Sequence, residues 1–362
     1  PSRPHHPDPL RRHRNTGIGI PAMRSDKLEN TNPEETVLES TVTPPYGGWT
    51  LINYIAARFR YHDRDSWISI IAEGRLQLNG RPAMPESVLK PRDRISFRTV
   101  LKEPPVNRDI TLLHEEEGFM VISKPPHLPS HADGNFIKNT LIYILSERMR
   151  EKGLRGKLHL AHRLDRETSG VMLIIKEKNL VNPFMRLFQE GGMHKEYAAL
   201  ARGRIAEERF SVEGFLIPDK ASRISFRKTL SPHPAENGIA SHTDFLVMER
   251  FPGAALLKAI PSTGRTNQIR IHLAHVGHPL LGDKLYGRTD EEYLDFIRRV
   301  REGGDPFAGL PGEPGRHMLH ASRLTFRHPR DGRELSFEAP LPERSEERRV
   351  GQECRSRWSP YH

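Results

Sequence analysis

The chain has 362 residues, enough for a well-buried core and more than one domain. Lys and Arg outnumber Asp and Glu by 56 to 46, and this formal charge of +10, with a pI of about 9.8, favours a polyanionic partner. The single cysteine, Cys354, excludes an internal disulfide framework and a thiolate zinc cluster, and no apolar run is long enough to span a bilayer. We therefore expect a protein of a reducing, cytoplasmic compartment with no membrane contact.

The two ends of the chain differ in composition from the rest. The N-terminal stretch is rich in Pro, His and Arg without apolar periodicity, so we expect residues 1–45 to be disordered. The closing stretch is rich in Arg and Glu and then holds the Cys and a Trp, so we expect 343–362 to be a non-native or disordered tail. Between these ends, the adjacent prolines at 104–105 predict a linker. The linker separates a small module at 47–101 from a larger domain at 107–342.

The small module is predicted to hold two short helices and a hairpin. Apolar residues recur at helical spacing over 51–59, and a second helix is expected to start after Ser66 and to stop at Gly74. The alternating segment 75–81 closes in an Asn-Gly dipeptide, which is typical of a hairpin turn, and 90–97 supplies a returning strand. This order predicts a small α/β module.

The larger domain is predicted to interleave strands with helices. Strand-like patterns lie at 110–114, 119–123, 171–175, 195–201, 224–227, 242–248, 254–260, 317–321 and 334–338. Helical patterns lie at 139–150, 266–276 and 291–301. This mixture indicates an α+β fold with a mixed, mainly antiparallel sheet.

The most informative segment is His162-Arg163-Leu164-Asp165-Arg166-Glu167-Thr168-Ser169-Gly170, which runs into an apolar strand. It places Asp165 between Arg163 and Arg166, and a carboxylate flanked by guanidinium groups is held ionised. A fixed, ionised Asp at the mouth of a strand can attack carbon or remove a proton. From the spacing alone, an Asp that caps a turn and pairs with Arg for structure explains the pattern equally well.

Four blocks of sequence resemble the RluA-type RNA pseudouridine synthases. They are Val121 to Pro125, His162 to Gly170, His194 to Tyr197, and Gly264 to His272 with Gly277 to Gly287 behind it. The resemblance covers about 107–342 and implies the pseudouridine synthase fold, with helices flanking the sheet. It also implies isomerisation of specific uridines in structured RNA, either rRNA or tRNA, through a catalytic Asp and a flipped-out base. It implies no cofactor and no metal.

The resemblance assigns roles to single residues. Asp165 would be the catalytic aspartate, which either attacks the anomeric carbon or removes a sugar proton, and Arg270 would pair with it. Tyr197 would pack against the flipped base and could act in removing its carbon-5 proton. Arg163 would fill the gap that the flipped uridine leaves in the RNA stack. Four further residues are expected to line the site or bind phosphate: Lys124, Arg265, Gln268 and His272.

Two positions depart from the family's pattern. Asn267 stands where the family usually has His, and His127 stands where a Gly often follows the Lys-Pro segment. Because Asn both donates and accepts hydrogen bonds, we expect the first departure to affect substrate detail more than activity.

The small module at 47–101 resembles the RNA-binding domain named for ribosomal protein S-four. The resemblance lies in the order helix, helix, Gly-Arg-x-x-x-Asn-Gly, strand. The residues expected on its phosphate-facing surface are Arg58, Arg60, His62, Arg64 and Arg75. A solvated basic face explains the same residues without RNA.

Other functions fit the sequence less well. Glycoside hydrolases pair two carboxylates, and Glu167, two positions after Asp165 in a turn, is expected to point elsewhere. His272 and His275 lack the carboxylate of a zinc site, and the kinase motifs that should surround H-R-L-D are missing. Two classes remain. One is an RNA pseudouridine synthase, monomeric and without a DNA partner; the other is a non-catalytic RNA-binding or ribosome-assembly protein that keeps the scaffold.

Overall fold

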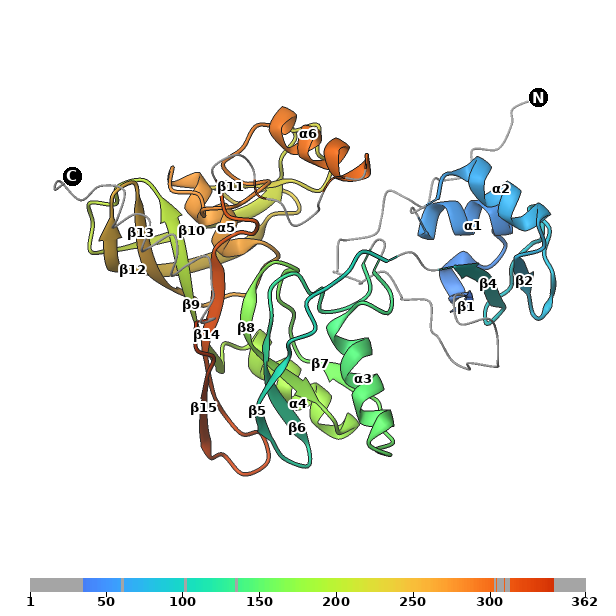
Figure 1. The fold of residues 1–362 in the computed structure, drawn as a ribbon, viewed down its shortest axis with the longest axis horizontal. Coiled ribbons are helices and arrows are strands. Elements are labelled where there is room, and N and C mark those ends of the chain that lie inside the picture. Colours follow the sequence, from blue (N-terminus) through green and yellow to red (C-terminus); the bar gives the residue numbers. More distant parts are fainter. Residues whose placement is uncertain are drawn as a thin grey trace. The chain divides into compact units, whose positions relative to one another are not determined.

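The computed structural model describes residues 35–59, 62–100, 103–133, 136–302, 304, 309 and 313–341 (Figure 1). The expectations for 1–34, for Arg60 and for the tail at 343–362 lie outside the described residues. The chain divides into two compact units: one combines the chain up to Pro105 with His131–Thr140, and the other combines Val106–Ser130 with the chain from Leu141 onward. No helix in the described ranges is long and apolar enough to cross a membrane.

The first unit is a four-stranded antiparallel sheet with two helices. In sheet order its strands are β1 (Glu35–Thr41), β4 (Arg94–Val100), β2 (Leu76–Leu78) and β3 (Arg81–Pro82). A short 3-10 turn, η2 (Pro44–Tyr46), precedes α1 (Leu51–Arg58) and α2 (Arg64–Ala72). Trp67 of α2 and Ile55 of α1 are buried in one cluster with Phe97 of β4. The two predicted helices and the hairpin are confirmed, although α2 begins before Ser66 because Asp63 caps it by accepting the Ser66 N–H at 2.8 Å.

Strand β1 corrects the expectation that disorder extends to residue 45. It pairs with the whole of β4, from Glu35 opposite Val100 to Thr41 opposite Arg94. Its alternate residues Thr36, Leu38 and Ser40 are buried, as the two-residue period of a strand requires. Two of the three inward residues are polar, so the segment carries no apolar alternation that would predict a strand.

The segment 131–140 belongs to the first unit, although the flanking residues on both sides belong to the second. The Glu103 carboxylate accepts the backbone N–H of Lys138 at 2.8 Å, and Lys138 Nζ donates to the Thr36 hydroxyl at 2.7 Å. Ile137 packs against the apolar cluster of this unit. The chain therefore passes between the units at three points, 105–106, 130–131 and 140–141.

The second unit is built on an eleven-stranded sheet with the order β11-β10-β12-β13-β9-β14-β8-β6-β5, where β7 also pairs with β8 and β15 with β14. The strands are β5 (Thr111–Glu115), β6 (Phe119–Lys124), β7 (His159–Leu160), β8 (Ser169–Ile175), β9 (Met193–Arg202), β10 (Arg209–Pro218), β11 (Lys228–Ser231), β12 (Ile239–Phe251), β13 (Ala254–Pro261), β14 (Leu319–Arg327) and β15 (Glu334–Glu338). Of the strand pairs in the described residues, β8 with β14 is parallel and the others are antiparallel. The predicted α+β class with a mixed, mainly antiparallel sheet is confirmed.

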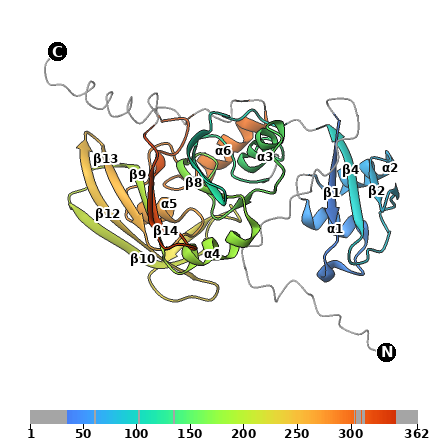
Figure 2. The ribbon, with the colours of Figure 1, turned by 90° about the horizontal axis from the view of Figure 1, so that it is seen from below.

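The described part of this unit also holds four helices: α3 (Leu141–Glu151), α4 (Lys178–Gln189), α5 (Gln268–His275) and α6 (Asp290–Arg301). Successive residues of β8 point to opposite faces, so Met172 is buried with α3 and Leu173 is buried with α4. Figure 2 shows these two helices on either side of β8. Helix α5 packs through Ile269 and Leu273 on the half formed by β9 to β13.

No element was predicted over 178–189, and one strand prediction in this unit is wrong. Pro183 argues against a helix over 178–189, yet α4 forms there and buries Leu180 and Phe184, because packing outweighs the single backbone hydrogen bond that a proline removes. The strand expected at 224–227 is wrong. That segment is a turn in which the Arg227 N–H donates to the Ile224 carbonyl at 2.9 Å, and the strand β11 begins at the next residue.

The parallel pair lies where the two halves of the sheet meet. Its register joins His320 to Ser169 and Ala321 to Gly170. Gly170 has a φ of 110°, and a Cβ there would lie 2.1 Å from the Ala321 carbonyl oxygen, so only glycine allows this approach. The segment 162–168 leads directly into this pair and is therefore fixed at the middle of the sheet.

Candidate active site

A pocket of about 340 Å³ lies beside the segment 162–168 in the second unit. Its walls come from that segment, from the C-terminal end of α4, from β9 and from the continuous stretch Pro261–Arg270. The volume falls in the range of small-molecule sites. Six of the predicted site residues line it: Arg163, Asp165, Tyr197, Arg265, Gln268 and Arg270.

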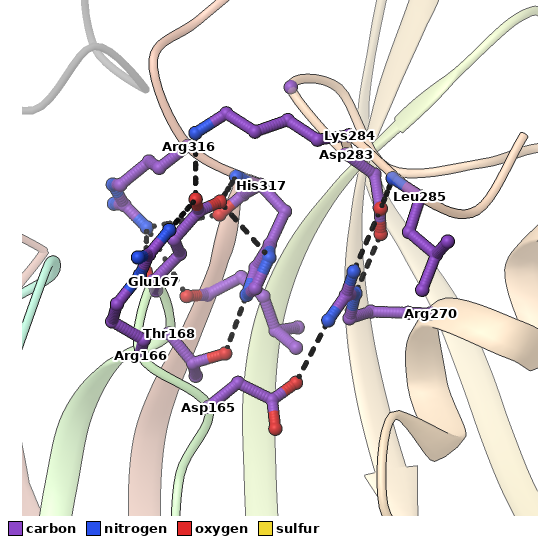
Figure 3. Close-up of polar contacts among 12 residues, drawn as sticks. Asp165, Arg166, Glu167, Thr168, Arg270, Asp283, Lys284, Leu285, Arg316 and His317 are labelled. Atoms are coloured by element: carbon purple, nitrogen blue, oxygen red, sulfur yellow. Dashed lines mark hydrogen bonds and ion pairs between the residues drawn. The ribbon is translucent and has the colours of Figure 1, made fainter. Parts of the chain in front are cut away.

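Asp165 and Arg270 meet in this pocket, although 104 residues separate them in the sequence. Arg270 Nη1 donates to Asp165 Oδ2 at 3.2 Å, as Figure 3 shows. The Asp165 side chain is 23% exposed and that of Arg270 is 11% exposed, so the carboxylate can be reached from the pocket while its partner lies behind it. This arrangement provides an aimed carboxylate with one fixed counter-charge.

Asp283 anchors Arg270 from the other side. Arg270 Nε and Nη2 donate to the two oxygens of the fully buried Asp283 carboxylate at 2.7 and 2.9 Å (Figure 3). The same carboxylate accepts the backbone N–H groups of Leu285 and Tyr286, both at 2.9 Å. Burial alone would raise the pKa of Asp283, but the charge and hydrogen bonds of Arg270 outweigh burial and lower it. A two-pronged pair of this kind fixes the plane of the guanidinium as well as its position.

Asn267 occupies the position where the family usually has His. Its φ of 58° lies in the left-handed region, which Asn tolerates better than most residues. Its Oδ1 accepts a hydrogen bond from Arg270 Nη1 at 3.0 Å, the same nitrogen that reaches Asp165. Asn267 therefore helps to orient Arg270, a task that either Asn or His can perform as an acceptor.

Tyr197 stands on β9 and lines the pocket while packing against apolar clusters on both sides. Burial, and then the charge of Asp165, raise the pKa of the Tyr197 phenol. The phenol is therefore neutral in the free protein at physiological pH, and it offers a flat ring with a hydroxyl close to the Asp165 carboxylate.

Gln268 lines the pocket, but its amide is already occupied. Gln268 Nε2 donates to the His242 carbonyl and to the Thr243 hydroxyl, both at 2.9 Å. Its Oε1 accepts the Thr263 hydroxyl at 2.7 Å and the Arg265 N–H at 3.0 Å. Gln268 therefore holds the segment 263–265 in place, whereas Arg265 itself is exposed at the pocket with its Nε on the Ala240 carbonyl at 3.1 Å.

The structure corrects the expectation that Lys124 contacts substrate. Lys124 is fully buried and does not line the pocket. Its Nζ donates to the carbonyls of Pro125, Leu128 and Arg166 at 2.8, 2.9 and 3.2 Å, and burial lowers its pKa well below the usual value. Lys124 instead ties the Lys-Pro segment to the loop that carries Asp165.

His272 is corrected in the same way. It is fully buried on the sheet side of α5, and its Nε2 lies 2.9 Å from the Ser241 hydroxyl. Burial lowers the pKa of His272 to about 4, so it is neutral at physiological pH. The side chain belongs to the core and not to the pocket. Among the described residues, no group of three or more His, Cys, Asp or Glu side chains could hold a metal ion.

Glu167 does not face the pocket. Figure 3 shows it turned away from Asp165 into a buried cluster, where Lys284 Nζ donates to Oε1 at 2.7 Å and the His317 N–H donates to Oε2 at 3.1 Å. Arg166 Nη2 adds a contact at 3.3 Å. Burial would raise the pKa of Glu167, but the positive groups around it lower the pKa strongly. The prediction that Glu167 points elsewhere is confirmed.

Sequence reasoning missed several residues of this region. Asp283 and Lys284 belong to the quoted block that ends at Gly287, so the resemblance marked them without giving them a role. Lys195 lines the pocket and precedes Tyr197 by two positions in a strand, a spacing that places both on one face. His317 showed no signal, because its partners lie in segments that are far away in the sequence.

Comparison with known proteins links this geometry to one family. The chain matches the family model described as RNA pseudouridylate synthase over residues 118–275. It is 32% identical over 303 residues to an uncharacterized RNA pseudouridine synthase of Chlorobaculum parvum, covering 80% of this chain and 90% of that protein. It is 31% identical over 279 residues to the uncharacterized RNA pseudouridine synthase YjbO of Bacillus subtilis, covering 75% and 88%.

Two further relatives add detail. Ribosomal large subunit pseudouridine synthase C of Escherichia coli is 29% identical over 322 residues, covering 83% of this chain and 92% of that protein. The solved structure of human RNA Pseudouridylate Synthase Domain Containing 1 superposes with a TM-score of 0.51 at 24% identity, covering 70% of this chain and 98% of that one. The second likeness supports the fold.

Proposed function

The chain belongs to the family of RNA pseudouridine synthases, and from that premise we propose that Asp165 is its catalytic carboxylate. The enzyme is an isomerase that converts uridine in RNA to pseudouridine. The bond from N1 of the uracil to C1′ of the ribose breaks and a bond from C5 to C1′ forms. C5 gives up its proton and N1 takes one up, so the composition of the nucleotide is unchanged. The observation that carries the proposal is the pocket carboxylate of Asp165 held by Arg270, which is itself fixed by Asp283.

Asp165 acts on the sugar by one of two routes. It either attacks C1′ as a nucleophile or removes a proton from the ribose, and both routes need an ionised carboxylate aimed at the sugar. Arg270 supplies the opposite charge and the orientation.

Tyr197 and Arg163 are assigned to the flipped base and to the gap that this base leaves in the RNA stack. We assign Tyr197 the role of packing against the extruded uracil, since an aromatic ring on the pocket wall suits a flipped base. A neutral phenol is a weak base, so removal of the C5 proton by Tyr197 requires prior loss of its own proton. Arg163 is exposed at the rim, from which it would fill the vacated position in the RNA stack.

We further assign the chain to the RluA-type branch, with a module resembling the ribosomal-protein-S-four domain in its first unit and a catalytic domain over about 107–342. Arg64 on the module is exposed, and Arg58 and Arg75 are partly buried by contacts to Tyr46 and to Glu73. Replacing Arg64 with Ala should lower the slope of log affinity against log salt by about one unit if the side chain contacts a phosphate. An unchanged slope would remove Arg64 from the RNA surface.

The names of the Escherichia coli relative and its counterparts favour ribosomal RNA of the large subunit as the substrate. Pseudouridine should then disappear at one or more rRNA positions when the gene is deleted and return when it is restored. Loss of pseudouridine from tRNA alone would overturn the choice of rRNA while leaving the enzyme class intact.

The decisive experiment replaces Asp165 with Asn, which keeps the shape and removes the charge. Tritium release from C5-labelled uridine in RNA should fall by several orders of magnitude, as for loss of a sole nucleophile or base, while RNA affinity persists. Asp244→Asn, on an exposed strand position away from the pocket, serves as the matched control and should release tritium like the wild type. Wild-type-like release from Asp165→Asn would sink the assignment, and a wild type that is inactive on every RNA would favour the non-catalytic RNA-binding alternative.

A further inference from the structure

Lys195 is a pocket residue to which the mechanism above gives no task. It lies on β9 two positions before Tyr197, so the two side chains emerge on the same face of the strand. Both line the pocket that holds Asp165. Lys195 is only 8% exposed, which is unusual for a lysine that reaches a binding site.

The Lys195 ammonium contacts the backbone of the facing pocket wall, at residues 263–264. Its Nζ donates to the Thr263 carbonyl at 3.2 Å, and a Cβ on Gly264 would lie 3.6 Å from the same nitrogen. Lys258, on the neighbouring strand β13, has the Glu196 carboxylate at 3.0 Å. Within the ranges that the structure describes, no carboxylate lies at ion-pair distance from Lys195, so its positive charge is held by a single carbonyl.

A second cation lies nearby without a carboxylate of its own. Arg265, which follows Gly264, lines the same pocket, and among the described residues it forms no ion pair. Burial, and then the charge of Arg265, lower the pKa of Lys195 to about 8. The charge of Lys195 in turn helps to keep His162, the neighbouring ring on the pocket wall, neutral after burial has already lowered its pKa.

The remaining charges of the pocket do not compensate this pair. Asp165 is the carboxylate on the pocket wall, and it is already engaged by Arg270. Arg163 adds a further positive group at the rim. A buried cation without a counter-charge lowers stability, and an anion entering the pocket would relieve that cost.

We propose that Lys195, together with Arg265, binds a backbone phosphate next to the flipped uridine and thereby positions its ribose against Asp165. The anionic groups of RNA are its phosphates, whereas uracil and ribose are neutral. A lysine ammonium suits a phosphate oxygen as a compact point charge, and a guanidinium adds directed donors. The inference rests on the proposed function, because it places the target nucleotide in this pocket.

Lys195 is thus a substrate-positioning residue that acts through affinity. Lys195→Gln should raise KM about 10- to 100-fold, the range for a hydrogen bond to a charged group, and change kcat less than about threefold. The slope of log affinity against log salt should fall by about one unit, because one phosphate contact is lost. Lys258→Gln, whose lysine already has Glu196, is the matched control and should leave KM and slope unchanged.

Protonation gives a second readout. Lys195 with a pKa of about 8 is charged below that pH and neutral above it, so the KM of the wild type should rise as the pH passes through about 8. Lys195→Arg stays charged and should keep a low KM across this window, while Lys195→Gln should show a high and level KM. The titratable and charged groups around this ammonium on the pocket wall are Arg265, Asp165, Tyr197 and His162, and the comparison with Lys195→Arg separates the effect of Lys195 from theirs.

The measurements use unmodified large-subunit rRNA transcribed in vitro, both for turnover and for equilibrium binding to Asp165→Asn with and without Lys195→Gln. A fall in kcat at unchanged KM would place Lys195 in the chemical step and overturn the proposal. An unchanged salt slope would also overturn it, since a contact to the neutral base leaves the slope alone. If Lys195→Gln does not fold, a KM of Lys195→Arg that still rises above pH 8 would refute it.

Different results would contradict the catalytic role of Asp165 and the phosphate contact of Lys195. If Asp165→Asn is inactive while Lys195→Gln behaves like the wild type, only the proposed phosphate contact is contradicted. An inactive wild type would remove the catalytic proposal, while the salt slopes of the binding measurements would still decide whether Lys195 contacts phosphate.

Discussion

Two carboxylates of the segment 162–168 lie two residues apart and have opposite surroundings. Asp165 is partly exposed in the pocket and has one cationic partner, Arg270, at 3.2 Å. Glu167 is buried among Lys284, Arg166 and the backbone of His317, and both of its oxygens accept hydrogen bonds. The same short loop therefore holds the carboxylate that we propose as catalytic and a second carboxylate that supports the structure.

The difference shows how the loop is kept in place without burying the carboxylate of Asp165. The hydrogen bonds of Glu167 join the loop to the segments that carry Lys284 and His317. Lys124 Nζ also donates a hydrogen bond to the Arg166 carbonyl of the loop. Asp165 can then remain accessible, since its position does not depend on burying its own charge. Substitutions at the two carboxylates should separate stability from activity.

The largest effect on stability is expected at Glu167. Glu167→Gln leaves the Lys284 ammonium buried without its counter-charge, so the free energy of unfolding should fall by about 3–5 kcal/mol. Asp165→Asn, on the accessible side, should change it by less than about 1 kcal/mol. Urea denaturation of both variants measures the contrast. Equal losses would show that the two carboxylates support the fold alike.

The next effect concerns the second anchor of Arg270. Asp283→Asn removes one prong and the charge that fix the guanidinium, so kcat/KM should fall about 100-fold, as for a small misplacement of a catalytic group. Asp290→Asn is the matched control, because Asp290 also accepts a hydrogen bond from an arginine, Arg227, but lies outside the pocket. A similar loss in both variants would mean that Asp283 acts on the fold in general.

A smaller effect should appear in acid. The folded-state pKa of Glu167 is lowered below its ordinary value of 4.5, so its contribution to stability is present above pH 4.5 and is lost as the pH falls toward the folded pKa. The gap in unfolding free energy between the wild type and Glu167→Gln should therefore shrink by about 1.4 kcal/mol per pH unit below about pH 4. Denaturation curves between pH 6.5 and 3.5 test this, and a constant gap would contradict a charged Glu167.

The smallest effect is expected at Asn267. Asn267→Ala removes one acceptor of Arg270 but leaves the Asp283 fork, so kcat/KM should fall only about three- to tenfold. Asn267→His, the residue usual in the family, should restore most of that activity. A loss in Asn267→Ala as large as in Asp283→Asn would contradict this prediction, because it would show that Asn267 supports Arg270 as much as Asp283 does.

The sequence predicted the elements of the fold better than their contacts. Periodicity located both helices of the small module, and it located α3, α5 and α6 within a few residues, because apolar residues recur on one face of each. It missed α4, where Pro183 argues against a helix, and β1, whose inward side chains are largely polar. In both elements, packing with residues far away in the sequence decides the structure.

The site was predictable only through the resemblance. No spacing rule brings Asp165 to Arg270, and a lone arginine on a helix reads as an exposed cation. Lys124 and His272 show the limit of the same reasoning, since a motif marks a residue without saying whether it faces the pocket or the core. Lys195 could have been found from strand alternation with Tyr197, which the sequence already displays.

Because the chain passes between the two units at three points, the small module cannot be removed as one continuous segment. The segment 131–140 completes the module, and it continues directly from Ser130, whose hydroxyl donates to the Leu164 carbonyl and accepts the Leu164 N–H next to Asp165. Excising the module at the linker would remove the apolar neighbours of Ile137 and leave 131–140 unpacked, next to the Ser130 that holds Leu164 through hydrogen bonds. In evolution or in engineering, this module can be exchanged only together with 131–140, so a domain exchange has to move two separate segments of the chain.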